Sequence, residues 1–430
     1  MRVKNLKIEN FRVIRNLDIS FDESDMIVFA GINGAGKTTA LVAMRYLFSW
    51  YVARLKTPKG KGFQLAESDI SNGQPYCFIE IEIEEQSKGA NRLVRWSLLK
   101  KRASYRKPID RLASRVELNH FVDSKMEVFA DGKEHNLPLV NFYSVNRGVD
   151  AVPLRVRKKH ELGPLDAFDS GLNNSVKFHS FFLWFREHED MENELYREQG
   201  KNFLGDKQLM AVRSAIKNLL PGYEKFRVKR NPLSFVLEKK GEVFNFGQLS
   251  DGEKSYIALV CDIARKMAMA NPESDRPLEM SAIVMIDEIE LHLHPEWQMG
   301  VVDHLRKTFP HVQFFLTTHS PHIVTNLKNS GEDTLIALDK GVAVLSKQNQ
   351  YGQTVDFILN DVFRLKSLRN GDVQKKIDKI WTLLKKGDCS SGKYRELLTW
   401  LRANINPADP EFMRIALQEK RIERGLHDFD

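Results

Sequence analysis

Cysteine is scarce in this sequence of 430 residues. Only Cys77, Cys261 and Cys389 occur, far apart and outside any CxxC or Cys/His cluster, so neither zinc-site spacing nor a disulfide framework is present. Long apolar runs are also missing, which excludes a transmembrane helix of about 18 residues or more. The opening segment MRVKNLKIENFRVI alternates polar and apolar residues and lacks the apolar core of a signal peptide. We therefore expect a cytoplasmic protein without a membrane partner.

Acidic residues are fewer than basic ones. Lys and Arg total 65 against 57 Asp and Glu, which gives a net charge of +8 and a pI of about 9.1. Three short segments are basic, at 100–115, 155–160 and 225–230. A basic balance fits a polyanionic partner such as nucleic acid, and it equally fits a lysine-rich solvated surface. Charge alone leaves both interpretations open, so DNA stays a candidate partner.

Apolar periodicity predicts the order of the elements. Strands are expected at 2–9, 16–21, 26–30, 76–86 and 138–146, with more strands within 92–131. Helices are expected over 177–220, where an aromatic stripe is interpreted as core, and two strands near 225–237 and 243–246. From 249 the predicted elements are helix 254–270, strand 282–286, helix 295–308, strand 313–316 and helix 321–327, with a helical tail from about 371. Such alternation is typical of a parallel sheet flanked by helices.

A glycine-rich segment follows the strand at 26–30 and opens a helix. It matches the phosphate-loop pattern GxxxxGK[ST] in full, in the strand–loop–helix context that the pattern requires. Glycines let backbone N–H groups point at phosphate oxygens, and the helix adds its positive end. Lys37 is expected to reach the β- and γ-phosphates of ATP and Thr38 to bind Mg²⁺. The expected nucleotide contacts are Gly31, Asn33, Gly34, Ala35, Gly36, Lys37, Thr38 and Thr39.

A second buried strand, 283–286, ends in two acids. Asp287 would lie beside the Mg²⁺ end of the phosphate loop, and Glu288 would polarise the attacking water as a general base. A strand that merely ends in exposed acids is the plain alternative. The position of these acids downstream of a phosphate loop favours the catalytic interpretation.

The segment Leu249–Lys254 (LSDGEK) resembles the ABC signature LSGGQ, with Asp251 and Glu253 as departures. In that class, the signature binds the γ-phosphate held by the other protomer. The resemblance therefore implies contacts from Ser250, Gly252 and Glu253 and a two-fold homodimer, or a larger even-numbered assembly, with composite sites. The plain alternative is a helix cap. The two departures leave open whether hydrolysis is slow.

Two further motifs resemble ABC ATPases of the RecF, Rad50 and SMC-head type. The strand ending at 316 runs into Thr-Thr-His-Ser, which places His319 as the switch histidine that senses the γ-phosphate. Asn10-Phe11-Arg12 is similar to the N-terminal motif in which the arginine approaches the nucleotide. The Q-loop glutamine of this class has two candidates, Gln64 and Gln74.

The motifs together predict an α/β fold: an ABC-type, RecF- or SMC-head-like P-loop ATPase with mixed sheets, a helical insertion and a helical C-terminal tail. We expect a first ATPase lobe at 1–150, a mainly helical insertion at 151–245, a second ATPase lobe at 246–345 and a helical interaction region at 346–430. The C-terminal tail of about 60 residues is either a simple cap on the head or a docking surface for a partner, and its length favours docking because it exceeds what closing a fold requires.

The spacing between motifs narrows the class. About 210 residues separate Thr38 from Leu249 without sustained heptads, so the chain is not a long-armed SMC protein. LHLHP at 291–295 resembles compact AAA_21-like and RecF-like ATPases. About 110 residues follow His319, too few and wrongly spaced for a Toprim nuclease.

Four segments resemble the ATPase subunit of Septu-type anti-phage systems, which is also found in some retrons: 141–148, 181–186, 351–363 and 385–388. In that family the ATPase works with a separate HNH nuclease subunit, and this chain has no HNH signature of its own. The resemblance implies an ATPase that gates a nuclease through ATP-dependent dimerisation. The alternative is a RecF-like repair ATPase that binds DNA directly. A transporter ATPase is disfavoured by the long span between motifs and by Asn-Phe-Arg.

Overall fold

The computed structural model describes residues 1–21, 23–87, 90–130, 137–147, 163–169, 171–172, 178–200, 203–219, 222–328, 331–345, 349–365, 367 and 369–424. The basic segment 155–160 lies outside the described residues. Contacts divide the chain into two compact units, Met1–Ile358 and Leu359–Asp430.

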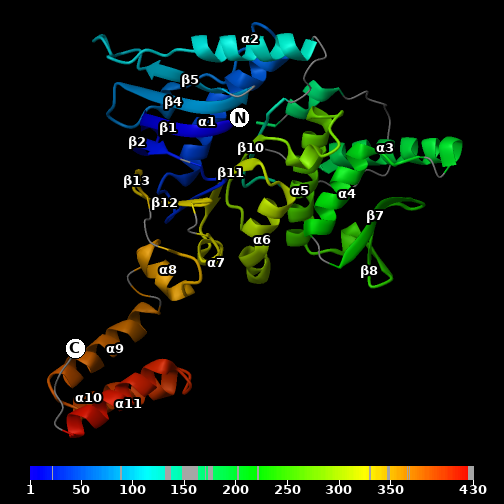
Figure 1. Ribbon diagram of the computed structural model, residues 1–430. Helices are drawn as coiled ribbons and strands as arrows, with labels where there is room; N and C mark the ends of the chain where they lie inside the picture. The colour runs from blue at the N-terminus through cyan, green and yellow to red at the C-terminus, as the bar shows by residue number, and fades with distance from the viewer. Residues whose placement is uncertain are drawn as a thin grey trace. The chain divides into compact units, whose positions relative to one another are not determined.

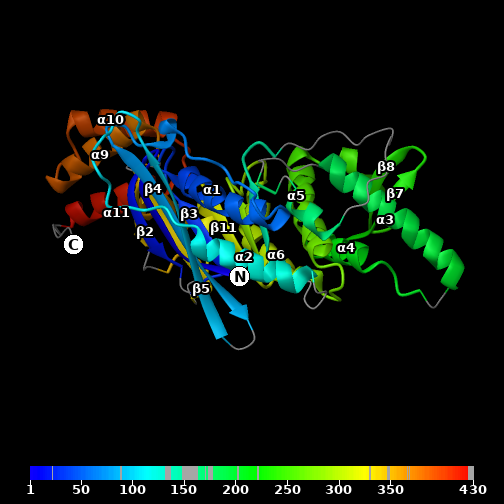
Figure 2. The ribbon, with the colours of Figure 1, turned by 90° about the horizontal axis from the view of Figure 1, so that it is seen from above.

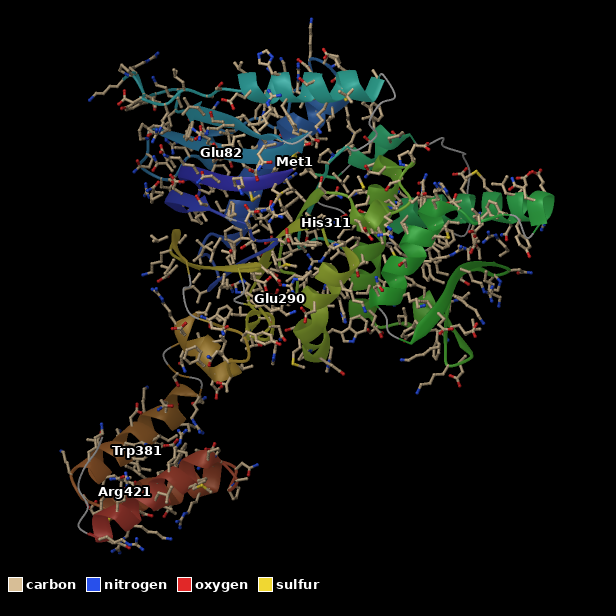
Figure 3. The ribbon with its side chains drawn as sticks, viewed as in Figure 1. Met1, Glu82, Glu290, His311, Trp381 and Arg421 are labelled. Atoms are coloured by element: carbon tan, nitrogen blue, oxygen red, sulfur yellow. The ribbon has the colours of Figure 1, made fainter. Side chains whose placement is uncertain are left out.

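A four-stranded antiparallel sheet forms one side of the first unit (Figure 1). Its order is β2 (Ile14–Ser20), β1 (Arg2–Phe11), β4 (Tyr76–Ser87) and β5 (Ala90–Lys101). In β4 the apolar residues Ile79, Ile81 and Ile83 are buried, while Glu82, labelled in Figure 3, alternates with them on the opposite face. The strands predicted from this alternation, at 2–9, 16–21 and 76–86, are confirmed.

Helix α2 (Val116–Ala130) covers β5 on its outer side, as the two views in Figure 1 and Figure 2 agree. More strands are predicted within 92–131; β5 confirms one of them, whereas residues 116–130 form a helix that the sequence analysis did not predict. The reason lies in the spacing, because Leu118, Phe121 and Val122 form the buried stripe of a helix at positions i, i+3 and i+4.

A six-stranded sheet forms the centre of the unit. Its order is β13 (Val342–Leu345), β12 (Asp333–Asp339), β3 (Met26–Ala30), β11 (Val312–Thr318), β10 (Ala282–Ile286) and β6 (Leu139–Tyr143). All pairings are parallel except that of β12 with β13. Because parallel strands end at one edge, the residues that follow β3, β6, β10 and β11 are brought together there.

Helix α1 (Lys37–Lys56) contacts strands of both sheets, and side chains on all its faces are buried between them. The other helices around the central sheet are α5 (Asp251–Ala270), α6 (Pro295–Thr308) and α7 (Pro321–Val324). Helix α7 ends at Val324, three residues earlier than the helix expected at 321–327. With two sheets around a phosphate-loop helix, the predicted α/β ABC-type ATPase fold is confirmed.

An insertion precedes α5 in the chain. It holds α3 (Phe178–Gln199) and α4 (Lys207–Leu219), followed by a three-stranded sheet of β7 (Tyr223–Arg230), β8 (Leu233–Lys239) and β9 (Glu242–Asn245). The predicted strand 225–237 is in fact two, because the chain reverses at Asn231–Pro232. The aromatic stripe is core as predicted: Phe181 and Phe185 pack against Phe235 at centroid distances of 5.6 and 5.3 Å.

The second unit is a small helical bundle. After α8 (Val355–Asp361), which crosses the boundary, come α9 (Gly371–Lys385), α10 (Gly392–Asn404) and α11 (Pro410–Glu423). Its core contains Ile377, Ile380, Leu384, Tyr394, Leu401 and Ile415. Trp381, labelled in Figure 3, donates from its indole nitrogen to Glu411 Oε1 at 2.6 Å and joins α9 to α11. Across the described residues of both units, no helix is long and apolar enough to cross a membrane.

Candidate active site

The phosphate loop joins β3 to α1. Gly31 has φ 147°, and a Cβ there would lie 2.2 Å from the carbonyl oxygen of Leu338, so this position accepts only glycine. Lys37, the first residue of α1, is buried and donates from Nζ to the carbonyl oxygens of Gly31 at 2.9 Å and Ile32 at 3.1 Å. The ammonium group therefore lies within the loop, where burial lowers its pKa.

The remaining predicted loop residues divide by exposure. Asn33 and Gly34 are exposed, whereas Ala35, Gly36 and Thr39 are buried. Ala35 N–H donates to the carbonyl of Ile32 at 3.2 Å, and its own carbonyl accepts from Gly341 N–H at 3.0 Å. These bonds tie the loop to the turn between β12 and β13.

The carboxylate of Asp287 forms hydrogen bonds with residues of two other elements. Its Oδ1 accepts from the hydroxyl of Thr38 at 2.9 Å and from that of Thr317 at 2.6 Å. Asp287 follows β10, Thr38 is on α1, and Thr317 is on β11. A carboxylate beside a hydroxyl is an oxygen donor set of the kind that Mg²⁺ prefers, so the residues fit this ion.

Glu288 follows directly and has a left-handed backbone with φ 47°. Its N–H donates to the hydroxyl of Thr317 at 2.7 Å, and its carbonyl accepts from the guanidinium of Arg147. Thr317 and Arg147 were not singled out from the sequence. Both residues contact the backbone of Glu288, Thr317 from β11 and Arg147 from just beyond β6, and no local sequence pattern predicts these contacts.

His319 follows β11 and reaches the same place. Its Nδ1 lies 3.5 Å from Lys37 Nζ, and its backbone N–H donates to Glu290 Oε1. Burial and then the charge of Lys37 lower the pKa of His319, while burial raises the pKa of Glu290. Glu290, labelled in Figure 3, lies in the loop between β10 and α6 and was also missed. The structure thus brings Lys37, Thr38, Asp287 and His319 together.

The signature residues form a separate cluster at the start of α5. Ser250 is the N-cap, and its N–H and hydroxyl donate to Glu253 Oε2 at 2.9 and 2.8 Å, so the helix cap considered as the plain alternative does exist. A Cβ on Gly252 would lie 2.0 Å from the carbonyl oxygen of His292, which explains the glycine. Among the described residues, no hydrogen bond or ion pair joins this cluster to the phosphate loop.

Arg12 lies in the turn between β1 and β2, where it has φ 53°. The turn adjoins the phosphate loop, since a Cβ on Gly36 would lie 3.2 Å from Ile14 Cγ1. The guanidinium of Arg12 is held by Asp69, with Nε to Oδ1 at 2.9 Å.

Among the described residues, no hydrogen bond joins either Q-loop candidate to the phosphate loop, Asp287 or Glu288. Gln64 Nε2 donates to the carbonyl of Gly62 at 3.4 Å, and the backbone of Gln74 bonds Ser71. Neither contact identifies the Q-loop glutamine.

Much of the basic surface is engaged within the chain. Arg102 donates to the carbonyl of Gln74 at 2.8 Å, Arg111 pairs with Glu9, and Arg115 stacks 4.1 Å over the ring of Trp50. Arg230 pairs with Glu189 and Asp190. These contacts give part of segments 100–115 and 225–230 a structural role.

Residues 26–325 match the family model AAA_21, described as "AAA domain, putative AbiEii toxin, Type IV TA system". The chain belongs to the AAA_21 family. The matched residues contain the phosphate loop, the signature-like segment Leu249–Lys254, the acids after β10 and His319. This AAA_21 chain is therefore a nucleotide-binding ATPase, as predicted.

Three relatives are similar over most of their length. The chain is 25% identical to "Retron Ec83 probable ATPase" of Escherichia coli over 98% of this chain and 87% of the relative. It is 26% identical to "Retron Vc95 probable ATPase" of Vibrio cholerae (92% and 86%) and to "Septu protein PtuA" of Bacillus thuringiensis (86% and 85%). The resemblance inferred from the sequence is confirmed. An SMC head domain from Thermotoga maritima aligns with a TM-score of 0.43 at 16% identity, over 80% of this chain and 98% of that one.

Proposed function

We propose that this ATPase is a subunit of a prokaryotic anti-phage defence complex, in which ATP-dependent pairing of two copies controls a separate HNH-type nuclease. The similarity to Septu and retron proteins supports the setting. The observation that carries the pairing is the exposed cap of α5: Ser250 and Asp251 face solvent, apart from the phosphate loop of their own chain. A second copy can bring this cap to that loop.

The residues around Asp287 divide the work of hydrolysis. The phosphate loop and Lys37 bind the phosphates of ATP, while Thr38 and Asp287 hold Mg²⁺. Bound there, Mg²⁺ neutralises charge on the phosphate oxygens. Glu288 takes the proton of the attacking water, and His319 contacts the γ-phosphate end of the substrate. Arg12 approaches the nucleotide from the neighbouring turn.

Glu253 distinguishes this chain from the usual signature. Its carboxylate already accepts the two donors of Ser250 where the γ-phosphate of the partner would arrive. The phosphate must displace that carboxylate before the composite site can close, so we expect slow hydrolysis. A switch that holds ATP is suited to gating.

The nuclease is proposed to dock on the second unit, Leu359–Asp430. Met413 and Leu417 are large apolar side chains one turn apart on α11, and they are exposed at 70% and 58%. The contact would be apolar, with charged residues around it.

Native mass spectrometry of the protein, co-expressed with its neighbouring genes, tests this proposal. The expected species with ATP is an even-numbered assembly that carries a second, smaller subunit. The variant Glu288→Gln should bind ATP and stay assembled, because the water lacks its base. The RecF-like alternative would instead be supported by a protein that carries no second subunit and dimerises only with ATP. Such a protein should also bind DNA with an affinity that falls steeply with salt.

A further inference from the structure

Arg147 is a buried arginine whose hydrogen bonds go to backbone carbonyls. It lies four residues after the end of β6, at 4% exposure. Its Nη1 donates to the carbonyl oxygen of Asp287 and, at 3.4 Å, to that of Ser144, and its Nη2 donates to the carbonyl oxygen of Glu288. One planar guanidinium therefore bridges two consecutive carbonyls, those of the acids that follow β10.

The peptide that Arg147 holds is in an unfavourable conformation. Glu288 has φ 47°, a left-handed conformation that is unfavourable for a residue with a side chain. Thr317 binds the N–H of this residue from β11, and Arg147 binds its carbonyl from the β6 side. Because the φ and ψ angles of Glu288 set the direction of its Cβ, these two contacts fix the direction in which its side chain leaves the backbone.

The surroundings explain why the residue is an arginine. Lysine offers a compact ammonium group, whereas the flat guanidinium presents parallel N–H donors that match two acceptors at fixed spacing. Asp287, Glu288 and Glu290 are the charged groups that act on Arg147. Burial lowers the pKa of Arg147 to about 10, so the side chain keeps its charge at neutral pH and offsets part of theirs.

We propose that Arg147 is a positioning residue for ATP hydrolysis, which fixes the left-handed turn at Glu288 and so aims the catalytic carboxylate at the attacking water. The proposal rests on the proposed role of Glu288 as general base. This role differs from that of a residue that only anchors the loop after β6. Loss of an anchor would lower stability, whereas loss of a positioning residue also lowers kcat in the protein that remains folded.

The experiment measures kcat and the Kd for a fluorescent ATP analogue in wild type, Arg147→Ala and Arg147→Lys, with full-length protein. Arg147→Ala should lower kcat by about 10- to 100-fold, the usual effect of losing a group that orients a reacting one, and change Kd less than about threefold. Arg147→Lys should remain impaired although it keeps the charge. Free guanidinium at about 50 mM, far below denaturing levels, should restore part of the kcat of Arg147→Ala.

Arg306→Ala is the matched control. Arg306 is also partly buried and forms ion pairs, with Asp303 and Asp333, outside the site. The variant Arg306→Ala should have a lower melting temperature and an unchanged kcat, and added guanidinium should not change that kcat. If Arg147→Ala does not fold, Arg147→Lys decides, because normal turnover in that variant overturns the bridging role.

Glu288→Gln run in parallel separates the two proposals. If Glu288→Gln turns over ATP normally, the assignment of the base fails. If Glu288→Gln is slow while Arg147→Ala keeps a normal kcat, or loses kcat only in proportion to folded protein and without rescue, the role of Arg147 alone is refuted.

Discussion

At the scale of single residues, one hydroxyl connects the two acids after β10. Thr317 donates to the carboxylate of Asp287 and accepts from the N–H of Glu288. It is fully buried, so neither bond can be replaced by water at the surface. Thr317 thus orients both Asp287, the proposed Mg²⁺ ligand, and Glu288, the proposed base, although our proposal gives it no contact with ATP.

Thr317→Val tests this arrangement, since valine keeps the shape and removes the hydroxyl. We expect a loss of about 1–3 kcal/mol in the free energy of unfolding, because buried polar partners are left unpaired. Steady-state hydrolysis should fall about tenfold or more while ATP binding is retained. Thr317→Ser, which keeps the hydroxyl, should stay close to wild type in both chemical denaturation and turnover. Equal kinetics in the two variants would show that the hydroxyl is not needed.

At the scale of elements, the sequence predicted what depends on local spacing. The strand at 282–286 and the helix at 295–308 were placed to the residue, because their apolar periodicity and flanking turns are strong. The contacts of Arg147, Thr317 and Glu290 could not be predicted in this way. They arise where β6, β10 and β11 end side by side, and that adjacency is a property of strand order. The roles of the predicted site residues remain predictions.

A buried charge cluster joins the signature helix to β6. Asp262 on α5 accepts from Tyr143 at 2.9 Å and pairs with Arg265 at 2.8 Å and Lys266 at 2.7 Å. Burial alone would raise the pKa of Asp262, but the two cations outweigh it and lower that pKa. The cluster thus links α5 to the strand whose end carries Arg147.

Asp262→Asn should reduce the free energy of unfolding by about 3–5 kcal/mol, because two buried cations lose their counter-ion. The pKa of Asp262 is lowered in the folded state. Its contribution to the free energy of unfolding is therefore complete when the pH is above the ordinary pKa of an aspartate, and it is lost as the pH falls below about 4. The difference between variant and wild type should therefore shrink in acid, as measured by urea unfolding at several pH values. Asp303→Asn, which alters a half-exposed ion pair, is the control and should cost less than about 1 kcal/mol.

At the scale of the whole molecule, the central observation is that no hydrogen bond or ion pair in the described part of the chain joins the α5 cap to the phosphate loop. If each active site takes its phosphate loop from one copy and its signature from another, two different defects can complement each other. Lys37→Ala damages only the first half of a site and Ser250→Arg only the second. In a mixed pair one site carries both defects and the other carries neither.

Each variant alone should hydrolyse ATP at a rate near background, whereas a one-to-one mixture should recover about a quarter of wild-type activity. Random pairing makes about half of the dimers mixed, and each mixed dimer has one intact site of two. Ser391→Arg removes a comparable helix-capping serine from α10 and should leave hydrolysis unchanged. A mixture that stays at the average of its two components, measured by phosphate release after exchange of subunits, would show that one copy completes its own site. In that case α5 would serve hydrolysis only as a packing element, and nuclease control would need a signal other than pairing through the signature.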